Sequence, residues 1–140
     1  MPAVMKRLGR PLNDADRALI RAAQETLRRG YQRNRHEVAA AVRTQRGATY
    51  VGLNIEGIHT PCAEPVALGA ALTAIDREVV SMVAVWRGRG EYPVLAPCGN
   101  CRQMLIDYAP KATVLLPVAP RRVARVPVTE ILPAPPWAFE

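Results

Sequence analysis

Every cysteine of the chain falls in two short motifs, and these motifs constrain the fold more than any other feature of the sequence. Cys62-Ala63-Glu64 is followed, further along, by Pro97-Cys98-Gly99-Asn100-Cys101. Three thiols with one neighbouring carboxylate form the donor set of a zinc site with an open fourth position and its own proton carrier. A structural zinc site normally has four protein ligands, and this chain has no fourth cysteine. We therefore expect a fold that brings the two motifs together for metal-assisted hydrolysis.

The length of the chain predicts a single domain. Its 140 residues are enough to bury a substantial core without help from disulfides. We expect one domain over 1–140, with residues 1–12 flexible and the proline-rich stretch 133–140 forming an extended tail.

Apolar spacing and turn residues predict helices that alternate with strands. The predicted helices cover 16–29, 63–75 and 101–108, with a short last helix at 128–132. The predicted strands cover 36–44, 49–55, 80–86, 113–117 and 123–126. This alternation is typical of an α/β layer sandwich.

Both cysteine motifs are predicted to lie where a helix begins. Helix N-termini carry partial positive charge and favour the thiolate form, so they suit Cys62, Cys98 and Cys101 as metal ligands. Glu64 falls in the first turn of its helix, close to the metal without being a ligand, where a proton carrier is needed. Arg102 follows Cys101 directly and is expected to offset the negative charge of the thiolates.

The positive charge of the chain raises the possibility of a nucleic-acid partner. The net charge is +7 and the isoelectric point is about 10.0. However, the basic residues are scattered among acids, and only seven aromatic residues are available to stack on bases. We expect a solvated basic surface, and we keep a nucleic-acid-binding zinc protein as an alternative.

The cysteine count and the hydropathy of the chain predict a cytoplasmic protein. Three cysteines cannot pair off evenly, which favours reduced thiols or metal ligation. No apolar run is long enough to suggest a membrane span, and residues 1–10 lack the apolar core of a secretory signal.

Two other interpretations of the cysteines explain less of the sequence. Cys98-Gly99-Asn100-Cys101 by itself could be a redox pair, but that does not account for Cys62-Ala63-Glu64. A purely structural zinc site would leave Glu64 without a purpose.

The pattern Cys-Ala-Glu followed by Pro-Cys-Gly-x-Cys-Arg resembles the zinc-dependent cytidine deaminases, particularly their small homotetrameric branch that acts on free nucleosides. The resemblance implies a three-layer α/β/α sandwich with a mixed central sheet of about five strands. It implies one zinc ion per subunit on Cys62, Cys98 and Cys101, with Glu64 as proton shuttle. The expected reaction converts a cytosine nucleoside to the uracil nucleoside and ammonia, as in pyrimidine salvage. Branches that edit polynucleotides typically have histidine in place of Cys62, which weighs against a nucleic-acid substrate.

Weaker matches to the family extend along the chain, over 38–44, 54–56 and 129–133. From them we expect Asn54 and Glu56 to bond the ribose 3′-hydroxyl group. The amide of Ala63 and a backbone carbonyl near Pro97 are expected to contact the base.

Several local strings resemble the blasticidin S deaminases, which act on a modified cytosine nucleoside. These strings are His36 and the stretches 40–44, 83–85 and 101–110. By contrast, Asn54 matches the cytidine enzymes, so both substrates remain open at this stage.

Three departures from the family pattern bear on the substrate. His36 stands where cytidine deaminases usually have a phenylalanine beside the base, and the loop 57–61 is short. Pro65 stands where many relatives have an arginine that bonds the thiolates, which leaves that task to Arg102.

The resemblance also implies contacts between subunits. The helix that starts at residue 63 is rich in small apolar residues, consistent with a face left over for a homotetramer. Trp137 and Phe139 either cover the core of their own domain or reach the active site of a neighbouring subunit.

Overall fold

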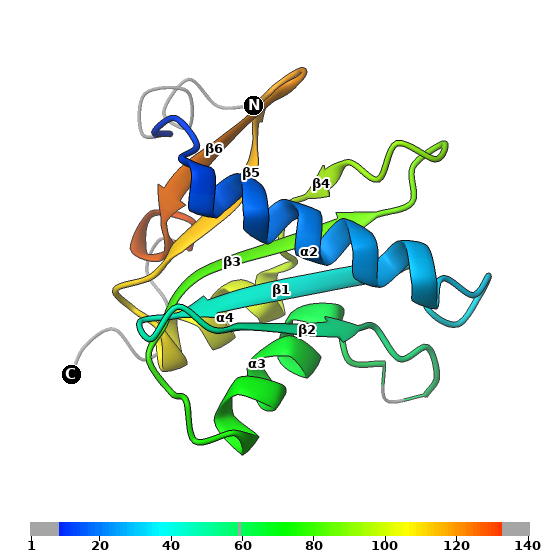
Figure 1. Ribbon diagram of the computed structural model, residues 1–140, viewed down its shortest axis with the longest axis horizontal. Coiled ribbons are helices and arrows are strands. Elements are labelled where there is room, and N and C mark those ends of the chain that lie inside the picture. The colour runs from blue at the N-terminus through cyan, green and yellow to red at the C-terminus, as the bar shows by residue number, and fades with distance from the viewer. Residues whose placement is uncertain (1–8, 59, 133–140) are drawn as a thin grey trace.

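A mixed sheet of six strands forms the middle layer of the computed structural model, which describes residues 9–58 and 60–132 (Figure 1). The strands are β1 (Val38–Thr44), β2 (Thr49–Leu53), β3 (Val79–Trp86), β4 (Val94–Leu95), β5 (Thr113–Ala119) and β6 (Arg122–Pro127). Their order is β2-β1-β3-β5-β6, and β4 pairs with β3. Only β3 and β5 run parallel among these pairs. The predicted α/β/α sandwich with a mixed sheet is confirmed.

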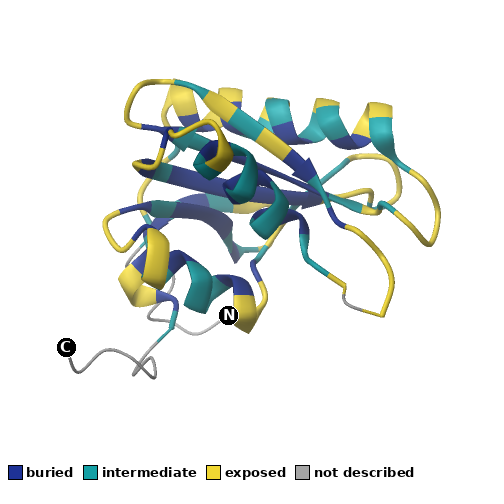
Figure 2. Cartoon of the chain, turned by 90° about the horizontal axis from the view of Figure 1, so that it is seen from below, coloured by how far each residue is buried: buried dark blue, intermediate teal, exposed yellow. Residues whose placement is uncertain are grey.

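Helices cover both faces of the sheet (Figures 1 and 2). Helix α2 (Asp14–Gly30) packs on one face. Helices α3 (Ala63–Thr73) and α4 (Gly99–Tyr108) pack on the other face, where the short 3-10 helix η1 (Val128–Glu130) adjoins α4. Figure 2 shows buried strands between helices whose outer turns are exposed.

Helix α2 owes its position to a capping box and one apolar stripe. The Asn13 side chain accepts a hydrogen bond from the Asp16 amide at 2.8 Å, and the Asp16 carboxylate accepts one from the Asn13 amide at 3.0 Å. Leu19, Ala23 and Leu27, at helical spacing, are buried against the sheet. The helix therefore begins two residues before the predicted start, at Asp14.

Successive side chains of β1 point to opposite faces of the sheet and join two separate core clusters. Ala39 and Ala41 join the α2 cluster, whereas Ala40 and Val42 join the cluster beneath α3 and α4. A strand that is buried on both faces has a continuous run of apolar residues, and this run is what predicted β1 from the sequence.

Several boundaries and one strand differ from the prediction. Strand β4 was not predicted because a two-residue strand carries no periodic signal, so the sheet has six strands instead of about five. The predicted strand at 36–44 begins at Val38, because His36 instead forms an isolated bridge with Gln32. The predicted ends at 55 and 75 lie beyond the true ends at Leu53 and Thr73, and β5 extends past 117 to Ala119. The predicted helix at 128–132 is the single 3-10 turn η1.

Most of the predicted flexible N-terminus lies outside the described residues, as does the predicted tail over 133–140. Within the described part, Arg10 pairs with Arg125 of β6, and Leu12 packs against the α2 cluster. Among the helices of residues 9–58 and 60–132, none combines the length and the apolarity needed to traverse a bilayer.

Candidate metal centre and its pocket

Two helix starts bring the three thiols together, as the sequence predicted. Cys62 is the N-cap residue of α3 and Cys98 that of α4, with similar extended backbone angles (φ −62°, ψ 166° and φ −68°, ψ 169°). Cys101 lies in the first turn of α4 and is fully buried. The three Sγ atoms all lie within 4.8 Å of one another, and those of Cys62 and Cys98 are 3.5 Å apart.

This spacing fits one zinc ion. Tetrahedral Zn–S bonds of about 2.3 Å place two sulfur atoms about 3.8 Å apart. The Sγ atoms of Cys62 and Cys98, 3.5 Å apart, lie close to that distance. In the described part of the chain, no fourth His, Cys, Asp or Glu belongs to the group. The site therefore suits a zinc ion that keeps one position open, as catalytic zinc sites do.

The protein alone favours the thiolate at only one of the three cysteines. Burial raises the pKa of Cys98, but hydrogen bonds from the Cys101 amide and the neighbouring thiols outweigh it, so the net pKa is lowered. Burial, followed by the thiol neighbour Cys98, raises the pKa of Cys62. Burial and the nearby Glu64 carboxylate raise the pKa of Cys101. The expectation that both helix starts favour thiolates thus holds for Cys98 and not for Cys62; ligation of a cation favours the thiolate at all three.

Glu64 is buried in the first turn of α3, next to the thiols. Its side chain is 4% exposed, and burial raises the pKa of its carboxyl group. Hydrogen bonds from its own backbone amide and with the Cys101 side chain lower that pKa in part. A raised pKa makes a carboxyl group a better proton acceptor, as a proton carrier requires.

A cavity of about 210 Å³ opens beside the thiols. It brings together Cys62, Ala63, Glu64, Cys98 and Asn54 from the predicted site. Its other walls were not predicted as site residues: they are Val38, Thr60, Pro61, Leu95 and Ala96.

Asn54 reaches the cavity with a fixed orientation. Its Oδ1 atom accepts hydrogen bonds from the amides of Glu37 and Val38, at 2.8 and 3.0 Å. Because the amide oxygen is used in this way, the NH₂ group is the part left to meet a ligand. Asn54 is therefore placed as a hydrogen-bond donor in the pocket.

Three predicted substrate residues do not line this cavity. His36 Nδ1 lies 2.8 Å from the Asn54 carbonyl oxygen, so this nitrogen is the donor and the ring supports the Asn54 backbone. Glu56 is exposed, and its amide donates to the Arg35 carbonyl. Pro97 is buried immediately before Cys98.

Arg102 contacts backbone carbonyl groups. Its Nε atom donates to the Pro97 oxygen and its NH1 atom to the Ile131 oxygen, both at 2.9 Å. No hydrogen bond from Arg102 to a thiol occurs among the described residues. Arg102 therefore fixes the Pro97-Cys98 loop against η1, and the expectation that it offsets the charge of the thiolates stays a prediction.

The remaining predicted site residues, Trp137 and Phe139, lie outside the described residues.

The pocket-lining residues that were not predicted had weak signals in the sequence. Val38 looked like an ordinary strand residue, and Leu95 and Ala96 stood in a stretch with no predicted element; only their position just before Pro97-Cys98 could have indicated the pocket.

Comparison with known proteins agrees with this site. Residues 13–116 match the family model of the cytidine and deoxycytidylate deaminase zinc-binding region. The chain is 32% identical to blasticidin-S deaminase of Bacillus cereus over 87% of this chain and 92% of that protein. It is 34% identical to a cytidine deaminase of Halalkalibacterium halodurans over 71% of this chain and 76% of that protein. Among solved structures, cytidine deaminase from Burkholderia pseudomallei superposes with a TM-score of 0.70 at 31% identity, over 88% of this chain and 98% of that one.

The family match covers both cysteine motifs and the whole thiol cluster. The fold, the three-thiol centre and the buried acid agree with a hydrolytic deaminase that uses zinc. The chain belongs to the cytidine and deoxycytidylate deaminase family.

Proposed function

We propose that the protein removes the amino group of cytidine, deoxycytidine or a closely related cytosine nucleoside. In this reaction the nucleoside and one water molecule give the uracil nucleoside and one ammonia molecule. The observation that carries the proposal is the buried carboxyl group of Glu64, which lies beside three clustered thiols in a cavity.

The residues of the chain divide the work between them. Cys62, Cys98 and Cys101 would hold the zinc ion, which when bound supplies a Lewis acid that activates water. Glu64 takes a proton from the water and delivers protons to the ring nitrogen and to the departing amine. Burial raises the pKa of its carboxyl group, which makes it a better acceptor of the water proton.

Asn54 and the pocket walls position the nucleoside. The free NH₂ group of Asn54 can donate to a ribose hydroxyl oxygen. Val38, Leu95 and Ala96 supply apolar walls for a planar ring. Glu56 is exposed and does not line the cavity, so its contact with the ribose rests on the sequence match alone.

A second candidate substrate is blasticidin S or another modified cytosine nucleoside. The specific observation that favours it is the similarity to blasticidin-S deaminase of Bacillus cereus along 92% of that protein. A nucleic-acid-binding zinc protein without turnover would not need the buried Glu64, and the family match argues against it.

We also infer a homotetramer acting in the cytoplasm. Helix α3 is apolar around most of its surface, and a Cβ at Gly69 would meet no described atom beyond its chain neighbours and the backbone of its own helix. An apolar helix with an uncovered side is suited to pack against another copy of the chain. Trp137 and Phe139 remain candidates to reach the active site of a neighbouring subunit.

A deamination screen tests the proposed function. Cytidine, deoxycytidine, blasticidin S, guanine and adenosine are each followed by ultraviolet absorbance, and the zinc content is measured on the same sample. We expect turnover of at least one cytosine nucleoside and about one zinc ion per subunit. Absence of turnover in a zinc-loaded sample, together with affinity for RNA or DNA that falls steeply with salt, would support the nucleic-acid alternative.

A further inference from the structure

Two of the three clustered cysteines face the cavity beside them. Cys62 and Cys98 line this cavity of about 210 Å³, whereas Cys101 does not line it and is fully buried. Cys98 is exposed and Cys62 is partly exposed. A small uncharged molecule in the cavity therefore meets Cys62 and Cys98 before it meets Cys101.

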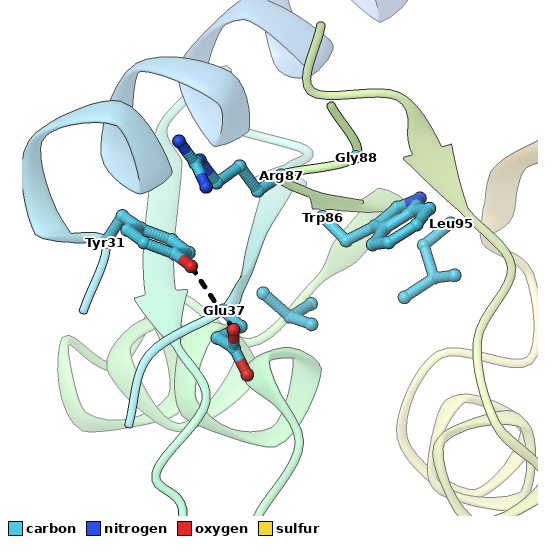
Figure 3. Close-up of a pocket in the computed structure, with 7 residues that line it drawn as sticks. Tyr31, Glu37, Trp86, Arg87, Gly88 and Leu95 are labelled. Atoms are coloured by element: carbon cyan, nitrogen blue, oxygen red, sulfur yellow. Dashed lines mark hydrogen bonds between the residues drawn. The ribbon is translucent and has the colours of Figure 1, made fainter. Parts of the chain in front are cut away.

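A second cavity of about 400 Å³ adjoins the cavity beside the thiols (Figure 3). Val38 and Leu95 line both cavities, and none of the three cysteines lines the larger one. Leu95 lies next to Trp86 there, with 37% of its surface exposed. Because Leu95 at the boundary is open to solvent, the cavity beside the thiols is not sealed inside the protein.

The two cysteines that line the cavity also have sulfur atoms in contact. The Sγ atoms of Cys62 and Cys98 are 3.5 Å apart. A disulfide bond holds two sulfur atoms at about 2.05 Å, so this pair has about 1.5 Å left to close. The exposed side chain of Cys98 is placed to supply that movement, because it is not packed in the core.

The spacing of the cysteines in the sequence favours a different pair. Cys98-Gly99-Asn100-Cys101 has the spacing of redox-active pairs at helix starts. In the fold, however, Cys101 is fully buried, and its amide donates a hydrogen bond to the sulfur of Cys98 at 3.4 Å. The fold therefore exposes Cys98 together with Cys62 instead of Cys101.

We propose that the zinc centre carries a reversible redox switch, in which a peroxide links Cys62 to Cys98 and leaves Cys101 as a free thiol. The link removes two of the three sulfur donors, so the protein no longer holds the metal. The formation of the bond rests on the thiol geometry, and its effect on activity rests on the proposed function.

The two steps of the oxidation balance in atoms and electrons. The Cys98 sulfur loses its proton and attacks one oxygen of hydrogen peroxide, the O–O bond breaks, and the other oxygen leaves as hydroxide, which takes up that proton to give water. The Cys62 sulfur then attacks the sulfur of the Cys98 sulfenic acid, the S–O bond breaks, and the hydroxyl group leaves as water with the proton of Cys62. The two sulfur atoms together lose two electrons to the peroxide. A dithiol restores both thiols by exchange and is itself oxidised to a disulfide.

Peptide mapping distinguishes the two possible pairs. Trypsin places Cys62 in the fragment 47–77 and both Cys98 and Cys101 in the fragment 90–102. The zinc-loaded protein is treated with hydrogen peroxide, and zinc release is followed with a chromophoric chelator. The remaining thiols are then blocked with iodoacetamide, and the unreduced fragments are weighed. A bond to Cys62 joins the two fragments, and backbone cleavage between Cys98 and Cys101 in the mass spectrometer identifies its partner.

We expect joined fragments linked through Cys98 and the release of about one zinc ion per subunit. Dithiothreitol followed by added zinc should restore both the thiols and the metal content. Fragments joined through Cys101, a bond confined to the fragment 90–102, or oxidation to sulfinic acid that dithiothreitol does not reverse would overturn the proposal.

Two matched variants test the choice of partner. Cys101→Ser leaves Cys98 as the partner of Cys62, and Cys98→Ser leaves Cys101. The bond should form roughly tenfold faster in Cys101→Ser, because Cys98 is exposed and Cys101 is buried. Equal rates in the two variants would contradict the inference, and if either variant fails to fold, the mapping of the unaltered protein decides.

The outcomes separate this inference from the proposed function. Turnover of cytidine and blasticidin S is measured on the same samples before oxidation, after oxidation and after reduction. If neither is deaminated at any stage but the Cys62–Cys98 bond forms and releases zinc, the proposed function fails and the thiol switch stands. If a nucleoside is deaminated and that bond does not form, the proposed function stands and the switch is rejected.

Discussion

Helices α3 and α4 each place a cysteine thiol at the candidate zinc site, but different interactions hold the two helices in position. Each begins at a cysteine N-cap with nearly the same backbone angles. Helix α3 buries five of its residues, whereas α4 buries only Cys101 and Leu105. Helix α3 is held by close packing on the sheet, and the start of α4 is held by hydrogen bonds from Arg102 to the Pro97 and Ile131 carbonyl oxygens.

The difference assigns the two helices different tasks. Helix α3 carries Glu64, whose proposed proton transfers require a fixed position, and its buried packing supplies that position. Helix α4 carries two of the three thiols and fixes its own N-terminus, because the Cys98 sulfur accepts a hydrogen bond from the Cys101 amide at 3.4 Å. The part with less buried packing thus depends more on polar contacts and on the metal.

The largest expected effect concerns the acid on α3. Glu64→Gln keeps the shape of the side chain and removes its ability to carry a proton, so we expect kcat to fall by about 10²- to 10⁴-fold. The zinc content should stay near that of the unaltered protein, because the three thiols are untouched. Steady-state kinetics and metal analysis on the same sample measure both quantities.

Glu78→Gln is the matched control, since it makes the same chemical change at an exposed position. It should leave kcat and zinc content unchanged. A Glu64→Gln variant with near-normal turnover would remove Glu64 from the reaction.

The next effect concerns the polar support of α4. We expect Arg102→Met to weaken zinc binding by about 10- to 100-fold, the range found for groups that orient metal ligands. Arg102→Lys keeps the positive charge but lacks the planar fork that reaches the Pro97 and Ile131 carbonyl oxygens together. It should therefore bind zinc almost as weakly as Arg102→Met in competition with a chromophoric chelator.

The lysine variant separates two roles of Arg102. If Arg102→Lys restores zinc affinity, the positive charge near the thiolates is what matters, as the sequence first indicated. That result would contradict the idea that α4, unlike the closely packed α3, is held in place by the hydrogen bonds of Arg102.

The contrast between these helices also explains what the sequence could predict. The thiols, Glu64 and the two helix starts were predictable because each rests on residue type and local spacing. The orientation of Asn54 and the contacts of Arg102 were not, because they depend on atoms of Glu37 and Ile131 far away in the sequence. Strand β4, with the pocket wall Leu95, escaped prediction for a related reason, since only its pairing with β3 gives it a defined place.

The smallest of these effects concerns how α3 sits on the sheet. A Cβ atom added to Gly52 of β2 would lie 2.6 Å from the Ala67 backbone nitrogen and 2.8 Å from Val66 Cβ. Neither atom can move without shifting α3, so we expect Gly52→Ala to lower the free energy of unfolding by about 1–3 kcal/mol. Because α3 carries Cys62 and Glu64, the same shift should lower kcat, which urea unfolding and steady-state kinetics on the variant would show together.

Gly69→Ala on α3 is the matched control. Apart from its chain neighbours and the backbone of its own helix, an added Cβ there meets no described atom within 4 Å, and alanine favours the helix by about 0.5–1 kcal/mol relative to glycine. In a single subunit this variant should therefore be slightly more stable, while in a tetramer that packs on this side of α3 it should weaken assembly, which sedimentation would detect. If Gly52→Ala proves as stable as the unaltered protein, α3 is not held by its close approach to β2, and the two helices differ less than their packing indicates.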